Sequence, residues 1–181
     1  MKNGIATAAL SELTAEIAAQ PAQGCVAYGV ALNWRSGTRA EVEALPMRIG
    51  NEQVSRGLRW EIDEPRQLGG SNHAPNPQEY LLSGLGGCLM VGFLVGASVR
   101  GIQIEQFSIE VHAELDLAGF LGARAGAPVA LGGIRYVMHV QAEAGDAVLE
   151  ELRELAEAHS PNARTLAHGV PIHGALARTP R

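Results

Sequence analysis

The chain has 181 residues, enough for one domain with a sizeable core, and 46% of them are hydrophobic. Fourteen Lys and Arg residues against 19 Asp and Glu residues give a formal net charge of −5. A mildly acidic chain without a basic run argues against nucleic acid or an anionic membrane as the main partner. The two cysteines, Cys25 and Cys88, are too few for a disulfide-stapled scaffold or a four-cysteine zinc site. We therefore expect a reduced, cytoplasmic protein.

The first twenty residues predict a short amphipathic helix rather than a secretory signal. Glu12 and Glu16 interrupt the apolar stretch that a signal would need, and Pro21 ends the helical pattern. The apolar residues share one side of this helix: Ile5, Leu10, Leu13 and Ile17. We treat residues 1–22 as an N-terminal helical extension and residues 23–181 as one domain.

Three strands and a loop are predicted next. Residues 26–34 and 39–45 read as two strands joined by a turn at Ser36 and Gly37. Residues 57–63 alternate apolar and polar side chains, which is typical of a third strand. Residues 64–76 are rich in Pro, Gly and Asn and predict a loop.

A long apolar helix follows, and its start is well marked. Asn76 is the expected N-cap, Pro77 occupies the first helical position, and Glu79 follows three residues after the cap. Residues 81–99 carry no charge, so this helix is long enough to span a membrane. The segments on either side alternate as strands with a polar face, and such strands need water on that face. This pattern favours a helix buried within a soluble domain.

The second half of the chain predicts further strands and a helix. Residues 107–117 and 134–142 alternate as half-buried strands, separated by a loop at 119–133. Residues 147–158 form an amphipathic helix pattern, and residues 170–177 read as a last strand. Grouped strands with few helices predict an α+β fold in which helices pack on antiparallel sheets.

Small residues lie four apart along the central helix: Gly84, Cys88, Gly92 and Gly96. A glycine inside a helix costs about 1 kcal/mol relative to alanine, so this stripe indicates that another backbone approaches closely. Cys88, in its middle, is either a buried structural cysteine or a reactive thiolate. A thiolate near neutral pH would need a neighbouring Arg, Lys or His.

The run DEPRQLGGSNHAPNPQEYLLSGLGGC, residues 63–88, resembles the OsmC/Ohr family of thiol peroxidases, in particular its OsmC-like branch. The later run HSPNARTLAHGVPI, residues 159–172, is similar to the second cysteine motif of that family. The resemblance covers residues 34–176. It implies a two-layer α+β fold, with antiparallel sheets packed on a buried central helix. It also implies an intertwined homodimer whose active sites use residues of both chains.

The resemblance implies reduction of organic hydroperoxides without a cofactor or metal. A thiolate on the central helix attacks the peroxide and becomes a sulfenic acid, and by motif position that thiolate is Cys88. An Arg from an early strand lowers its pKa, which we assign to Arg39, with Arg35 as the rival. A Glu near the helix start holds that Arg, and Glu79 is the nearest match.

Both assignments have a structural alternative. Glu79 can serve as the capping-box partner of Asn76. Arg39 can be a solvated strand residue that pairs with Glu41 or Glu43 on the same face.

Two departures from the family pattern matter. Ser160 stands before Pro161, where the family carries its resolving cysteine, and a hydroxyl cannot attack a sulfenic acid to form a disulfide. An external thiol would therefore regenerate the enzyme, unless Cys25 came within about 7 Å between Cα atoms. Gln78 stands where peroxidases of the family tend to carry their Glu. These departures support a second hypothesis, a non-catalytic stress or small-ligand-binding protein that has lost the redox cycle.

The six histidines do not predict a metal site. His112 and His139 are both on predicted strands, and no pair has the spacing of a zinc site. Three others lie around the second motif: His159, His168 and His173. They leave a Cys–His hydrolase as a third hypothesis, although no oxyanion-hole motif accompanies it.

Overall fold

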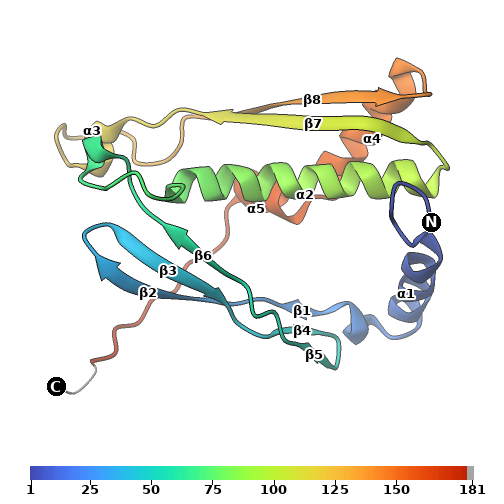
Figure 1. Ribbon diagram of the computed structural model, residues 1–181, viewed down its shortest axis with the longest axis horizontal. Helices are drawn as coiled ribbons and strands as arrows, with labels where there is room; N and C mark the ends of the chain where they lie inside the picture. The colour runs from blue at the N-terminus through green and yellow to red at the C-terminus, as the bar shows by residue number, and fades with distance from the viewer. Residues whose placement is uncertain (179–181) are drawn as a thin grey trace.

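Two layers of strands lie on either side of a long central helix in the structure, a computed structural model that describes residues 1–178 (Figure 1). The N-terminal half forms one layer, the C-terminal half forms the other, and α2 (Pro77–Val99) runs between them. This arrangement confirms the predicted α+β fold with antiparallel sheets and a central helix. The other elements are α1 (Thr7–Ala19), η1 (Pro21–Gly24), β1 (Val26–Ala27), β2 (Val30–Ser36), β3 (Arg39–Ala44), β4 (Met47–Ile49), β5 (Glu52–Val54), β6 (Arg59–Ile62), η2 (Arg66–Leu68), β7 (Ile104–Ala113), α3 (Leu117–Phe120), β8 (Ile134–Ala142), α4 (Asp146–Ala158) and α5 (Pro161–His168).

The N-terminal layer is an antiparallel sheet in the order β2-β3-β6, extended by the short sheet β1-β4-β5. Leu32 lies opposite Val42, and Val42 lies opposite Trp60, so one face of the larger sheet is apolar. The predicted strand at 26–34 is divided into β1 and β2, and the third strand is shorter than predicted. The sequence analysis missed β4 and β5, which are only three residues long each.

The start of α2 confirms the predicted capping box. Asn76 Oδ1 accepts a hydrogen bond from the Glu79 backbone N at 2.8 Å, and Glu79 Oε2 accepts one from the Asn76 backbone N at 2.8 Å. Tyr80 donates its hydroxyl to the Glu61 carbonyl oxygen at 2.6 Å, which joins the first turn of α2 to β6. By length and composition α2 could cross a membrane, but here it packs against β7, α4 and α5 as a core helix.

The C-terminal layer pairs β7 with β8, and its inner face covers α2. The ring of Phe107 on β7 lies 4.9 Å from the ring of Phe93 on α2, measured between centroids. Leu152 and Ala156 of α4 complete a buried cluster with Phe93 and Ala97. The core therefore lies where α2, α4 and the sheet β7-β8 meet.

The small-residue stripe of α2 packs against α4 of the same chain. A Cβ on Gly92 would lie 3.3 Å from the Ala156 Cα, and one on Gly96 would lie 3.0 Å from Leu152 Cδ2. The predicted close approach of another backbone is therefore satisfied within one chain.

The segment before α1 is tied to the far end of α2. Asn3 Nδ2 donates to Ser98 Oγ at 3.0 Å and to the Ile102 carbonyl oxygen at 2.9 Å. Asn3 Oδ1 accepts from the Ile104 backbone N at 2.9 Å. The helix α1 itself, found within the predicted range, has no buried residue.

Asp63, directly after β6, organises the loop that leads to α2. Its side chain is wholly buried and accepts hydrogen bonds from Ser71 Oγ at 2.5 Å and Thr38 Oγ1 at 2.6 Å. It also accepts from the backbone N atoms of Glu64, Ser71 and His73 at 2.9 to 3.0 Å. The Ser71 hydroxyl, followed by the Thr38 hydroxyl and the backbone donors, holds the pKa of Asp63 well below its usual range.

Two expectations for the C-terminal region are wrong. The described part of residues 170–177 contains no strand, because no neighbouring strand pairs with it in this chain. The sequence analysis also missed α5, which begins at Pro161 with Ser160 as its N-cap. The predicted loop at 119–133 contains the single-turn helix α3 at its start.

Replacing Ala156 with a larger residue tests the contact between α2 and α4. Ala156→Leu should lower the free energy of unfolding by about 2 kcal/mol, because the added carbons have no space beside Gly92. Ala158→Leu, at an exposed position of the same helix, should change it by less than about 0.5 kcal/mol. Equal effects of the two variants in chemical denaturation would contradict this packing.

Removing the charge of Asp63 tests the loop. Asp63→Asn should lower the melting temperature at pH 7 by about 5 °C or more, because its backbone and hydroxyl donors lose a charged acceptor. The folded pKa lies below the unfolded one, so this carboxylate stabilises the fold above about pH 4 and the contribution is lost as the pH falls. Thermal melts from pH 7 to pH 2 should therefore show a weaker acid dependence for Asp63→Asn. Asp146→Asn, at the exposed start of α4, is the control and should keep the wild-type profile.

Candidate functional site

Cys88 is a free, partly buried thiol in the middle of α2. One turn earlier, the Gly84 carbonyl oxygen accepts a hydrogen bond from Asn162 Nδ2 of α5 at 2.8 Å. One turn later, Gly92 touches Ala156 of α4. Because these residues share one stripe, Cys88 faces the connection between α4 and α5.

Ser160, where the family carries its resolving cysteine, lies in that connection. Its side chain is buried, 2% exposed, and its Oγ accepts a hydrogen bond from the Ala163 backbone N at 3.1 Å. The hydroxyl thus caps α5. Cys25, the only other cysteine, is exposed and precedes β1 in the opposite layer.

The two candidate arginines pair with carboxylates on their own sheet. Arg39 Nη2 lies 3.5 Å from Glu61 Oε1, and Arg35 forms an ion pair with Glu41. The structural alternative for Arg39 is therefore correct in kind, but its partner is Glu61 rather than Glu41 or Glu43. Among residues 1–178, no hydrogen bond or ion pair joins Cys88 to Arg39, Arg35 or Glu79. Glu79 acts as the capping-box partner, and its catalytic role stays a prediction.

Glu64 is an acid group that the sequence analysis did not single out. Its Oε2 atom is buried and has no hydrogen-bond partner within the described part of the chain. Burial, with further contributions from the charges of Asp63 and Glu79, raises its pKa. The beginning of α2 therefore carries an acidic side chain whose charge a nearby cation would stabilise.

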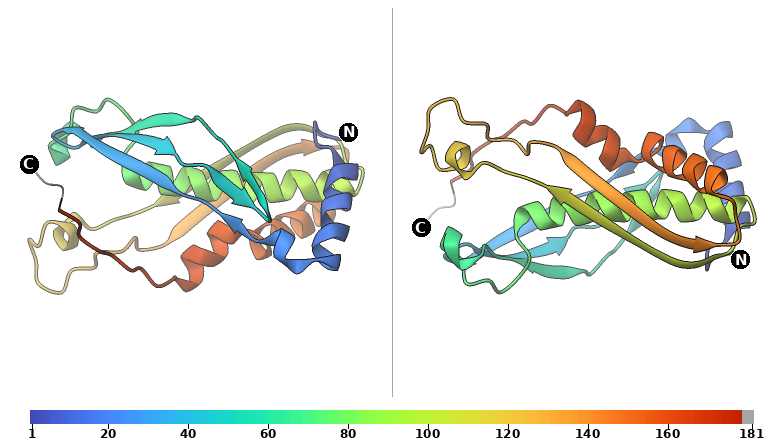
Figure 2. Two further views of the ribbon diagram at one scale, coloured as in Figure 1. Left: turned by 90° about the horizontal axis from the view of Figure 1, so that it is seen from below. Right: turned by 90° about the horizontal axis from the view of Figure 1, so that it is seen from above.

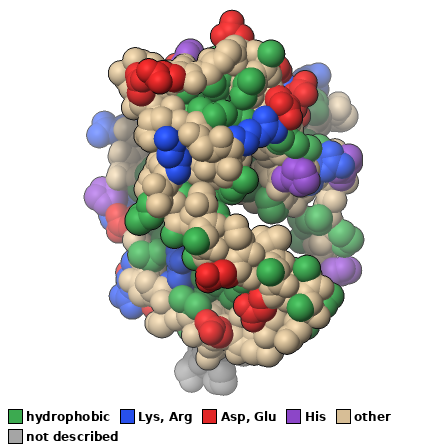
Figure 3. Space-filling view, turned by 90° about the vertical axis from the view of Figure 1, so that its right-hand side faces the viewer, with side chains coloured by type: hydrophobic (Ala, Val, Ile, Leu, Met, Phe, Trp, Pro, Cys, Tyr) green, Lys and Arg blue, Asp and Glu red, His purple; other side chains and the backbone are tan. Residues whose placement is uncertain are grey.

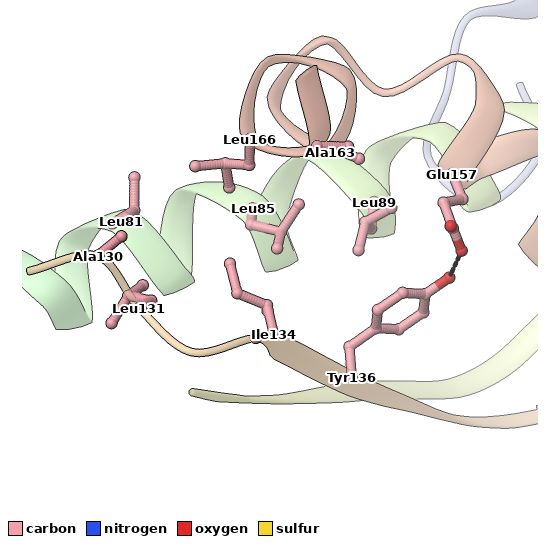
Figure 4. Close-up of a pocket in the computed structure, with 12 residues that line it drawn as sticks. Leu81, Leu85, Leu89, Ala130, Leu131, Ile134, Tyr136, Glu157, Ala163 and Leu166 are labelled. Carbon is pink, nitrogen blue, oxygen red and sulfur yellow. Dashed lines mark hydrogen bonds between the residues drawn. The ribbon is translucent and has the colours of Figure 1, made fainter. Parts of the chain in front are cut away.

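An apolar cavity of about 520 Å³ lies along the N-terminal half of α2 (Figure 4). It opens between α2, α5, the start of β8 and the segment before β8, where the leucine stripe continues beyond the end of α4. Figure 4 shows Leu81, Leu85 and Leu89 of α2 on one side and Leu131 and Ile134 on the other. Its volume and apolar lining are typical of a site for a small organic molecule.

A polar cluster closes one end of this cavity. Tyr136 of β8 donates its hydroxyl to Glu157 of α4, as Figure 4 shows. Arg153 Nη1 donates to the Tyr136 hydroxyl oxygen at 2.7 Å and to Glu157 Oε2 at 2.8 Å. Burial, followed by the hydrogen bond to Glu157, raises the pKa of Tyr136, so its hydroxyl is protonated at neutral pH.

Large apolar side chains are exposed where the two layers face each other. Val91 of α2 is 60% exposed, and a Cβ on Gly87 would meet nothing within 4 Å among the described atoms. On β2, Leu32 is 55% exposed and Trp34 is 74% exposed. Figure 3 shows the molecule hollowed between its upper and lower parts, with hydrophobic side chains around the opening. Such a surface is typical of a protein–protein interface.

The histidines form no metal centre. His112 Nε2 lies 3.4 Å and His139 Nε2 lies 3.8 Å from carboxylate oxygens of Glu110, on the outer face of the sheet β7-β8. Within residues 1–178, no group of three His, Cys, Asp or Glu side chains could hold a metal ion. None of the histidines around α5 is hydrogen bonded to Cys88 in that range.

Comparisons with known proteins agree with this architecture. An OsmC-like protein from Mycoplasma pneumoniae is 16% identical, with a TM-score of 0.60, and the match covers 80% of this chain and 89% of that one. An organic hydroperoxide resistance protein OsmC from Legionella pneumophila is 20% identical, with a TM-score of 0.56, covering 78% and 90%. An organic hydroperoxide resistance protein from Elizabethkingia anophelis is 16% identical, with a TM-score of 0.54, covering 79% and 89%.

These structures share the fold at low sequence identity. No curated protein matches the chain. The family model for OsmC-like proteins matches residues 69–173, which is more than half of the sequence and includes α2, Cys88 and Ser160. The chain belongs to the OsmC-like protein family.

Proposed function

We propose that this protein reduces organic hydroperoxides with Cys88 and is regenerated by an external thiol. The observation that carries the proposal is the position of Cys88, a free thiol on the same stretch of α2 as the leucines of the apolar cavity. Membership of the OsmC-like family supports it, as do fold relatives named organic hydroperoxide resistance proteins. The cavity would receive the organic part of the substrate.

The reaction balances with one cysteine. The Cys88 thiolate attacks the terminal oxygen of the hydroperoxide, the O–O bond breaks, and an alkoxide leaves and takes up a proton to become an alcohol. The thiolate is oxidised to a sulfenic acid, and the peroxide is reduced. An external thiol then attacks the sulfur, a mixed disulfide forms, and water leaves. A second external thiol releases Cys88 as a thiol and becomes part of the product disulfide.

A cation beside the sulfur would keep Cys88 ionised near neutral pH. We propose that a homodimer supplies it, with Arg39 of one chain serving Cys88 of the other and Glu79 holding that arginine; Arg35 is the rival. Three observations support a second chain: the exposed apolar surface between the layers, the uncovered Gly87, and the unpaired Glu64. Thiol regeneration also fits a reducing cytoplasm.

Replacing Cys88 tests the peroxidase proposal. Wild type should consume cumene hydroperoxide in the presence of a small dithiol, and Cys88→Ser should lose at least about 99% of that rate, because a hydroxyl is not ionised at neutral pH. Cys25→Ser is the matched control and should keep the wild-type rate. Equal, slow consumption by wild type and Cys88→Ser in a peroxide assay would exclude the enzyme.

The second candidate is a non-catalytic protein that binds a small apolar ligand. The cavity of about 520 Å³ and the serine at position 160 favour it. The rate of thiol alkylation against pH separates the two candidates, because a Cys88 pKa near that of a free thiol, about 8.5, supports the binding protein and a clearly lower one supports the peroxidase. In the peroxidase, Arg39→Ala should raise this pKa more than Arg35→Ala does.

A charge on the exposed face of α2 tests the homodimer. Val91→Asp should raise the dimer dissociation constant by about tenfold or more, because the carboxylate would be buried without a partner. Val137→Asp is the control, since Val137 is 49% exposed on the outer face of β8. Light scattering after size-exclusion chromatography measures both. A wild-type protein that stays monomeric at micromolar concentration would exclude the shared active site.

A further inference from the structure

The segment that follows α5 has no neighbour in its own chain. The Gly169 backbone N donates to the Thr165 carbonyl oxygen, and no hydrogen bond joins residues 170–178 to any other described residue. Ile172 is 92% exposed and Leu176 is 91% exposed. Figure 2 shows this segment leaving α5 as an extended chain and lying apart from β2 in the left-hand view.

The sequence of this segment is that of a strand with one apolar face. Val170, Ile172 and Leu176 fall on one side of an extended chain, and Pro171, His173 and Ala175 fall on the other. An extended segment becomes a stable strand only when its backbone N–H and C=O groups find partners. Free in solution, three large apolar side chains would gain nothing from being held in that alternation.

The free edge of β2 offers the matching surface. The sheet order β2-β3-β6 leaves β2 paired along one edge only, over seven residues. Its apolar residues have the same spacing of two, and all are exposed: Val30 is 53%, Leu32 is 55% and Trp34 is 74% exposed. A long apolar edge strand invites aggregation unless it is covered.

We propose that residues 170–177 of one protomer pair as an added strand with the free edge of β2 of a second copy of this chain. This inference rests on the homodimer of the proposed function and names a segment that would hold it together. Eight extended residues span about 26 Å, enough to cross to a neighbouring protomer. Exchanged in both directions about a twofold axis, the two pairings give a closed dimer.

The composition of the segment suits this position. Pro171 has no N–H to donate, which is tolerated in a strand at the edge of a sheet. Val170, Ile172 and Leu176 would extend the apolar face that Leu32, Val42 and Trp60 already form across β2, β3 and β6. The segment would thereby close the open edge of the N-terminal layer.

Truncation after Gly169 tests the pairing, measured as the dimer dissociation constant by light scattering over a range of concentrations. The truncated chain and Ile172→Asp should each dimerise at least about tenfold more weakly than wild type. His173→Asp, on the opposite side of the segment, is the matched control and should change the constant by less than about threefold. Hydrogen exchange should show the amides of residues 172–177 protected in wild type and unprotected in Leu32→Asp, but still protected in Val137→Asp.

A mixing experiment shows that the pairing is between chains. The truncated chain keeps an intact β2, and the Leu32→Asp chain keeps an intact C-terminal segment, so a heterodimer can form one of the two pairings. Mixed, they should associate more tightly than either does alone, which also shows that both variants are folded. A wild-type monomer would overturn the homodimer itself. A truncated chain that dimerises as tightly as wild type would overturn only the added strand.

Discussion

The close contact between α2 and α4 is the constraint on which the rest of the fold depends. α2 has 23 residues and no charge beyond Glu79, so it must bury much of its surface to be stable in water. Gly92 lets the backbone of α4 approach at Ala156, and Phe93, Ala97 and Leu152 fill the space around that contact. A larger residue on either helix would separate them and expose the core.

The position of α4 also determines which parts of α2 remain available. α4 ends at Ala158, so it covers only the C-terminal half of α2. The leucine stripe of the other half faces the apolar cavity, while Cys88 faces the connection that carries Ser160. The face with Gly87 and Val91 stays open toward the N-terminal layer. One helix thus presents a thiol, an apolar cavity and an uncovered face within a few turns.

The polar groups near the start of α2 show how a loop can hold a helix in place. Asp63 accepts hydrogen bonds from Thr38, Ser71 and His73, so the loop from β6 to Asn76 has a defined shape although it contains little regular structure. Buried acceptors of this kind are stable only when their donors are complete. Glu64 differs, since its buried oxygen has no partner in residues 1–178, and it adds negative charge where a second chain could bring a cation.

Elements with strong local signals were predictable from the sequence. The capping box at Asn76 and Glu79, the alternation of β8 and the amphipathic pattern of α4 gave those elements nearly within their observed bounds. The short strands β4 and β5 and the short helix α5 were missed because a few residues carry too little periodicity. The strand expected at 170–177 has the right alternation but no partner in this chain, and alternation alone does not supply hydrogen bonds.

For the candidate site, the sequence by itself identified Cys88, the small-residue stripe and the missing resolving cysteine, because each is a matter of residue type and spacing. Only the tertiary structure decided that α4 fills the stripe, that Arg39 pairs with Glu61, and that a cavity opens beside Leu85. These outcomes depend on contacts between residues far apart in the chain, and a local pattern carries no information about which distant surface will meet it. Helix starts and strand faces follow from neighbouring residues, whereas ion pairs and cavities follow from how the layers are stacked.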